Sequence, residues 1–214
     1  MQPIYITKSL AAASANNIAQ AQTPGGAGNL ILNGSAVVNG VAVLDTARQV
    51  LLTFAASEAG HNFTIFGTSQ SGVAISEVIA GTGAGTVASV LNYKTVTRIA
   101  ISAGATGNVS AGTNGVGASD WRPLNLGPTP FQLGVALIIT GTVNASVNYT
   151  YEDPNVPIVP GGQPTAFSLT ALAAKAASTD GGAFNIPIAA IQLVINSGTG
   201  TATLVVDQAG IGSP

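Results

Sequence analysis

Charged side chains are scarce in this chain of 214 residues. Six Lys and Arg and eight Asp and Glu make up 7% of the sequence, whereas an ordinary soluble domain has roughly 25%. A surface with so little charge has few barriers against association. We therefore expect partners to cover much of this surface, and we predict a homo-oligomer, most simply a trimer.

The basic residues are also too dispersed for two kinds of partner. Nucleic acids and anionic membranes attract clusters of Lys and Arg, but no two basic residues are adjacent in this chain. The longest apolar run, 133–139, is far shorter than the roughly 20 residues that span a bilayer. Cysteine is absent, which excludes disulfides and thiolate metal sites. We predict that neither nucleic acid nor a membrane is a partner.

Residues suited to catalysis are few. His61 is the single histidine, and it lies with Glu58 in what the pattern indicates is an exposed turn between two strands. The carboxylates are isolated in sequence except Glu152 and Asp153, which would point to opposite faces of a strand. The glycine-rich segment 81–86 lacks the lysine of a phosphate-binding loop. We predict no enzymatic activity, no metal and no cofactor, and almost no loss of stability in His61→Ala.

Residues 1–28 are expected to form an extended N-terminal arm. They are rich in Ala, Asn and Gln, and they lack the apolar core of an export signal. Such a segment cannot bury enough apolar surface by itself to offset its ordering entropy. Ile4, Tyr5 and Ile6 could add a short strand to a neighbouring subunit, and a frayed terminus is the alternative. Removing residues 1–25 should then weaken assembly and leave the rest folded.

Beyond the arm, the sequence alternates with a period of two residues. Val147, Tyr149 and Tyr151 are separated by polar residues, and similar alternation occurs at 63–65 and 202–206. This period is typical of half-buried strands. Many short strands separated by Gly, Asn, Ser and Thr indicate an all-β protein with a sandwich or jelly-roll-like architecture.

A strand–turn–strand pattern occurs twice. The earlier copies are 50–54 with 62–65 and 96–102 with 108–110, and the later copies are 137–140 with 148–151 and 190–196 with 201–203. We predict two related β-sandwich domains in tandem, 29–118 and 119–214, after the arm of residues 1–28. Trp121 lies at the start of the second domain, where we expect it to plug a contact between domains or subunits.

Several short motifs, in this order, carry a resemblance to a known family. They are 40–48, 63–68, 76–81 and 93–99 in the first half and 130–131, 141–142, 149–154 and 207–210 in the second. Together they resemble a class of tailed-bacteriophage virion proteins found beside head and tail genes. The resemblance covers about residues 28–212, and it implies a structural role in the particle without catalytic residues.

The sequence therefore predicts a capsid decoration, or cement, subunit that binds and stabilises the head shell. The major capsid protein is its expected partner, and its expected location is the virion, assembled in the bacterial host cytoplasm. A tail, fibre or head–tail connector component is the alternative, followed by a carbohydrate-binding module on the virion surface. Ile4, Tyr5, Ile6 and Trp121 are the candidate interface residues.

Overall fold

The prediction of an all-β protein is confirmed by a computed structural model of the chain, which describes residues 3–127, 130–156 and 163–208. Strands make up 60% of the structure. Within the described residues the one helical element is a 3-10 turn, η1 (Thr170–Leu172). None of the described segments forms a helix long and apolar enough to cross a membrane.

The strands separate into two compact units, each with its own hydrophobic core. The first unit is Ala12–Val116, and the second combines Met1–Ala11 with Gly117–Pro214. The strands pair in two antiparallel sheets of 4 and 12 strands. The boundary predicted after residue 118 lies close to the point where the chain re-enters the second unit.

The first unit is built around two long strands that pair with each other, β5 and β8. Along the sheet the order is β2-β9-β5-β8-β6-β7, while β3 pairs with β8 and β4 with β5. Alternate residues of β5 and β6, such as Leu52, Phe63 and Ile65, are fully buried in the first core. The strands are β2 (Ser14–Gln22), β3 (Gly28–Asn29), β4 (Val37–Val38), β5 (Val41–Phe54), β6 (Asn62–Thr68), β7 (Ala74–Ala80), β8 (Gly85–Ile101) and β9 (Val109–Ala118).

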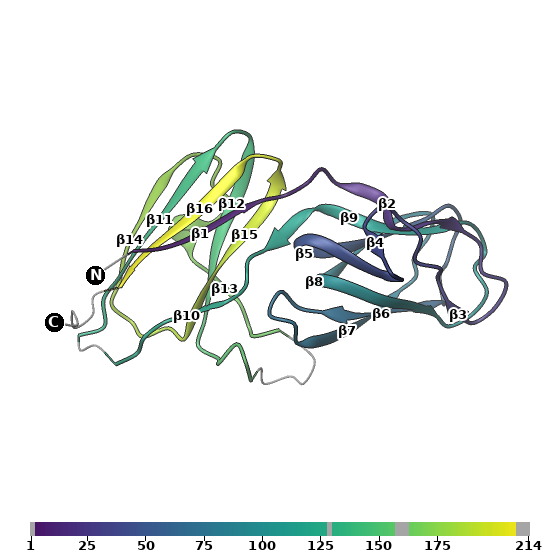
Figure 1. The fold of residues 1–214 in the computed structure, drawn as a ribbon, viewed down its shortest axis with the longest axis horizontal. Coiled ribbons are helices and arrows are strands. Elements are labelled where there is room, and N and C mark those ends of the chain that lie inside the picture. The colour runs from purple at the N-terminus through teal and green to yellow at the C-terminus, as the bar shows by residue number, and fades with distance from the viewer. Residues whose placement is uncertain (1–2, 128–129, 157–162, 209–214) are drawn as a thin grey trace. The chain divides into compact units, whose positions relative to one another are not determined.

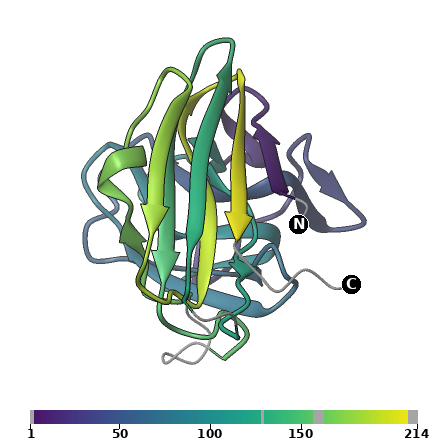
Figure 2. The same cartoon turned by 90° about the vertical axis from the view of Figure 1, so that its left-hand side faces the viewer.

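The second unit is a sandwich of two layers. One layer has the order β1-β16-β11-β14, and the other has β13-β12-β15 with β10 paired to β15 (Figures 1 and 2). Alternate residues of both layers, including Val147 and Leu204, are buried between them in the second core. The strands are β1 (Ile4–Ser9), β10 (Arg122–Pro123), β11 (Leu133–Thr140), β12 (Val143–Thr150), β13 (Phe167–Ser168), β14 (Thr179–Phe184), β15 (Ala190–Gly198) and β16 (Thr201–Gln208).

The predicted free arm is not seen in residues 3–28. All six residues of β1 pair with β16 of the same chain, and β2 lies against β9 (Figure 1). Ile18 of β2 is fully buried in the first core, and Ile4 and Ile6 of β1 pack against the second. Local composition did not show this, because the strand that pairs with β1 lies at the other end of the sequence.

Candidate functional site

The candidate interface residues of β1 lie on an edge strand of the second unit. Ile4 and Ile6 point toward the second core, whereas Tyr5 points outward and exposes 63% of its surface. This alternation follows from strand geometry, because successive side chains point to opposite faces. β1 is the last strand of its layer, and one side of it pairs with β16.

Trp121, the fourth candidate, lies between β9 and β10 in the second unit. Its side chain is half-buried, and its indole N–H is buried without a hydrogen-bond partner among the described residues. Buried indole N–H groups usually have a partner. The backbone N–H of Trp121 donates to Asp120 Oδ1 at 3.0 Å. Burial raises the pKa of Asp120, whereas this hydrogen bond and the charge of Lys8 on β1 act in the opposite direction.

The first unit uses most of its charge internally. Five of its six charged side chains bond to backbone groups of the same unit, and the sixth, Arg98, lies 3.9 Å above the ring of Phe66. The five are Asp45, Arg48, Glu58, Glu77 and Lys94. Four of the five bond to backbone at bulges or loops, and Arg48 bonds to the Asn114 carbonyl within β9.

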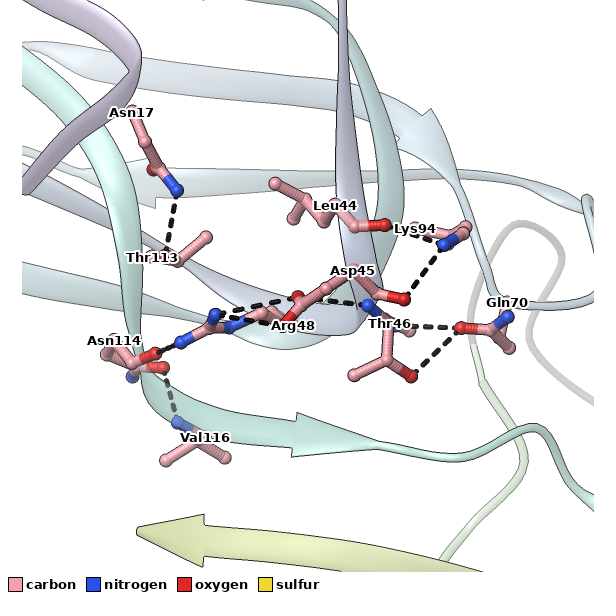
Figure 3. Close-up of polar contacts among 11 residues, drawn as sticks. Asn17, Leu44, Asp45, Thr46, Arg48, Gln70, Lys94, Thr113, Asn114 and Val116 are labelled. Carbon is pink, nitrogen blue, oxygen red and sulfur yellow. Dashed lines mark hydrogen bonds and ion pairs between the residues drawn. The ribbon is translucent and has the colours of Figure 1, made fainter. Parts of the chain in front are cut away.

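A bulge interrupts the long strand β5 and exposes backbone groups that side chains then bind. β5 pairs with β8 at Val43 and again at Arg48, with a register shift between them. Gln70 Oε1 accepts from Ala47 N at 2.8 Å, and Lys94 Nζ donates to the Leu44 carbonyl at 2.6 Å (Figure 3). Bulges leave ladder groups unpaired, so these two side chains replace the missing strand contacts.

Arg48 is the largest fully buried side chain among the described residues, with 1% of its surface exposed. Its Nη1 lies 3.4 Å from Asp45 Oδ2, and its Nη2 donates to the Asn114 carbonyl on β9 (Figure 3). A buried guanidinium is tolerated only when such partners compensate for its lost hydration. Arg48 therefore ties the β5 bulge to β9.

Glu77 fastens a second bulge, in β8. Its carboxylate oxygens accept from the backbone N–H groups of Val90 at 2.9 Å and Leu91 at 3.0 Å. In the core beside these strands lies Tyr93, whose hydroxyl donates to the Ile65 carbonyl at 3.4 Å. Burial raises the pKa of Tyr93 well above its ordinary value, and the charge of Glu77 acts in the same direction.

Glu58 and His61 form a pair that corrects the expectation for this turn. Both lie between β5 and β6, but the Glu58 side chain is fully buried and His61 Nδ1 is 2.8 Å from Glu58 Oε2. Glu58 Oε1 accepts from the backbone N–H groups of Thr106 and Gly107 at 2.9 and 3.0 Å. His61 is thus part of a buried hydrogen-bond network, and His61→Ala is no longer expected to be silent.

The polar groups of this turn bond to one another and to nearby backbone. Both oxygens of the Glu58 carboxylate are engaged, Oε1 by the backbone N–H groups of Thr106 and Gly107 and Oε2 by His61 Nδ1. In the part of the chain that the structure describes, no three His, Asp or Glu side chains form a group that could hold a metal ion. In the glycine-rich segment, residues 81–84 connect β7 to β8 and residues 85–86 are the first two of β8.

The second unit carries an exposed aromatic cluster that the sequence did not predict. The ring of Tyr149 lies 5.7 Å from those of both Tyr151 and Phe167, and 5.8 Å from that of Phe184. Tyr151 exposes 53% of its surface and Phe167 43%. The alternation that includes Tyr149 and Tyr151 was visible, but Phe167 and Phe184 come from strands that the sequence did not distinguish.

Comparisons with known proteins identify no relative. No family model matches the chain, and neither the curated proteins nor the solved structures contain a significant match to it.

Proposed function

We propose that this chain is a structural, non-catalytic subunit of a tailed-bacteriophage virion, and that it decorates and stabilises the capsid shell. The major capsid protein is its proposed partner, and further copies of the chain are a second one. The order of short motifs that resembles phage virion proteins supports this assignment.

The use of charge in the first unit carries this proposal. Free-standing soluble proteins keep their surfaces apart with exposed charge. Here five of the six charged side chains are bonded to backbone groups of the same unit. The surface retains exposed aliphatic residues instead, such as Val90, Val78 and Ile31, with 77%, 62% and 67% of their surfaces exposed. A subunit covered by partners in its working state is expected to have such a surface.

We further propose that the two units are related by tandem duplication. In the first unit β9 lies between β2 and β5, and in the second β16 lies between β1 and β11. Likewise β6 pairs with β7 and β8, as β12 pairs with β13 and β15. The first half of β8 pairs with β5, as β14 pairs with β11. In both units, strands that come in the same order along the chain therefore have equivalent pairing partners. This agreement supports a common origin.

Copy number in the virion tests the decoration proposal. Purified particles of the phage that encodes the chain would be analysed by quantitative mass spectrometry before and after removal of the tails. Hundreds of copies that remain with the heads would support decoration of the shell. Six to twelve copies, or loss with the tails, would instead assign the chain to the tail, fibre or head–tail connector.

The aromatic cluster favours a second candidate, a carbohydrate-binding surface module. Exposed rings such as Tyr151 and Phe167 can stack against sugar rings. A glycan array with the purified protein tests this candidate. Binding that is lost in both Tyr151→Ala and Phe167→Ala would support it, whereas an array without signal would exclude it for the glycans displayed.

A further inference from the structure

The outer side of β1 is an open sheet edge. β1 is the terminal strand of the order β1-β16-β11-β14, and all six of its residues pair with β16 without a register shift. In an antiparallel strand about half of the backbone N–H and C=O groups point away from the partner. No other segment of the described residues bonds to those groups of β1.

The opposite edge of the same layer, β14, is protected by its irregularity. Its pairing with β11 shifts between Val135 and Ala136, and Gly182 adopts a left-handed φ of 77°. The Asp180 carboxylate caps this kink by accepting from Gly182 N at 2.8 Å. Bulges, glycine and inserted charge prevent an edge strand from pairing with another chain. The sequence of β1, IYITKS, contains no glycine or proline, and its pairing with β16 has no bulge. Its one charge, Lys8, lies on the inward-pointing set.

The corresponding edge in the first unit is covered by the chain itself. β2 pairs with β9 as β1 pairs with β16, and the segment 31–36 lies along the outer side of β2. Gly34 N donates to Ile18 O at 3.1 Å, and Ala36 N donates to Asn17 O at 2.8 Å. The covering segment follows β2 in sequence, whereas the chain after β1 leads into the first unit. β1 therefore has no equivalent cover from its own chain.

We propose that the cover is β1 of a second copy, paired antiparallel about a two-fold axis perpendicular to the layer. When Ile6 lies opposite Ile6 of the partner subunit, the inward-pointing side chains of both copies lie on one face of the combined layer. The outward-pointing side chains of both copies lie on the other face. Tyr5 then lies opposite Thr7 of the partner subunit, and Lys8 opposite Ile4 of the partner subunit. The strand is self-complementary in this register, because Lys8 does not lie opposite Lys8 of the partner subunit. The result is one continuous eight-stranded layer.

This geometry favours a two-fold dimer over the trimer that composition alone suggested. A self-complementary edge forms a closed contact between two copies, whereas a trimer through the same layer would need β1 to pair with the protected edge β14. The inference does not depend on the virion location, because it concerns the isolated protein.

Two charge variants on the outward face of β1 test the dimer. In the proposed register, Tyr5→Lys/Thr7→Lys places like charges opposite each other twice, and Tyr5→Glu/Thr7→Lys places opposite charges there. Sedimentation equilibrium should give wild-type protein twice the mass of the 21.0-kDa chain. The dissociation constant should rise by about tenfold or more in the Lys/Lys protein and return toward the wild-type value in the Glu/Lys protein. Val38→Lys, at an exposed position of β4, is the control and should leave the dissociation constant unchanged.

Disulfide formation between introduced cysteines tests the register of the two β1 strands directly, because the natural chain has no cysteine. Cross-strand neighbours have Cα atoms within disulfide reach. An oxidised mixture of Tyr5→Cys and Thr7→Cys proteins should therefore form cross-linked dimers far faster than either protein alone. A monomeric or trimeric wild-type protein, or an unchanged dissociation constant in the Lys/Lys protein, would overturn the proposal. If the wild-type protein is a monomer, the partner of the β1 edge would instead be an extended segment of another protein.

Discussion

At the scale of single residues, the buried Glu58 shows how this protein uses its few charges. Three hydrogen bonds converge on its carboxylate, from Thr106 N, Gly107 N and His61 Nδ1. Together they join the loop after β5 to the loop after β8. A buried carboxylate is costly unless each oxygen is satisfied, so the three donors and the acceptor depend on one another.

We predict that Glu58→Ala lowers the free energy of unfolding by about 3 kcal/mol, because the backbone N–H groups of Thr106 and Gly107 lose the carboxylate to which they donate. His61→Ala should cost about 1–2 kcal/mol, since the buried carboxylate loses one charge-assisted partner. Urea unfolding of each variant measures both losses. Asp153→Ala is the matched control, because among the described residues its carboxylate bonds only to Asn155 in its own turn, and it should cost less than about half a kcal/mol. Equal effects in all three variants would contradict the network.

Tyr149 is the second residue whose replacement should be severe. Its ring packs against the second core and lies next to Tyr151, Phe167 and Phe184. Tyr149→Ala should lower the free energy of unfolding by about 2–4 kcal/mol, because it removes a large partly buried ring and the contacts of three aromatic neighbours. Tyr149→Phe keeps the ring and should cost far less. A thermal melt that shows similar loss in both variants would mean that the hydroxyl, rather than packing, matters.

At the scale of elements, the two N-terminal strands belong to different units. β1 contributes Ile4 and Ile6 to the second core, while β2 contributes Ile18 to the first. The two strands that looked like one dispensable arm therefore support separate cores. Truncations of different length should distinguish them.

We predict that deleting residues 1–9 destabilises the second unit by roughly 2–4 kcal/mol, because it removes a hydrogen-bonded strand and two packed isoleucines. Deleting residues 1–25 should destabilise both units, contrary to the expectation for an arm. Trp121, the single tryptophan, lies in the second unit, so its fluorescence reports that unit, and circular dichroism reports the whole chain. The Tyr5→Lys/Thr7→Lys protein is the reference, since it keeps β1 without the proposed dimer contact. Unchanged unfolding in both truncations would restore the arm interpretation.

At the scale of the whole molecule, the second unit is discontinuous in sequence. The first unit is inserted between β1 and the remaining strands of the second, although each has a separate core. β1 and β16 run antiparallel, and Ile4 pairs with Val206 near the end of β16. A short connection from the end of β16 to the start of β1 would therefore make a β-hairpin.

We predict that a permuted chain, 117–208 followed by a short glycine-rich turn and residues 3–11, folds as an independent unit. Residues 117–214 alone should be far less stable, because β16 would become an exposed edge and the core would lose Ile4, Ile6 and Leu10. Cooperative urea unfolding followed by Trp121 fluorescence measures both chains. If the shorter chain unfolds at the same urea concentration as the permuted one, β1 is not an integral strand of this unit.

The sequence by itself determined the class of the protein. Alternation at 63–65, 147–151 and 202–206 predicts which side chains face the core, and Phe63, Val147 and Leu204 are indeed fully buried. This information is local, because the two faces of a strand are encoded by neighbouring residues. The turn around His61 was found in the same way.

Only the tertiary structure decided which strands pair and what the charged residues do. β1 finds β16 at the far end of the chain, and Glu58 finds the amides of Thr106 and Gly107. Neither contact leaves a local pattern, because the pairing partner of a strand and the orphaned groups of a bulge or loop are defined by residues distant in sequence. Low charge was visible from the start, but its internal use appears only once the bulges in β5 and β8 are in place.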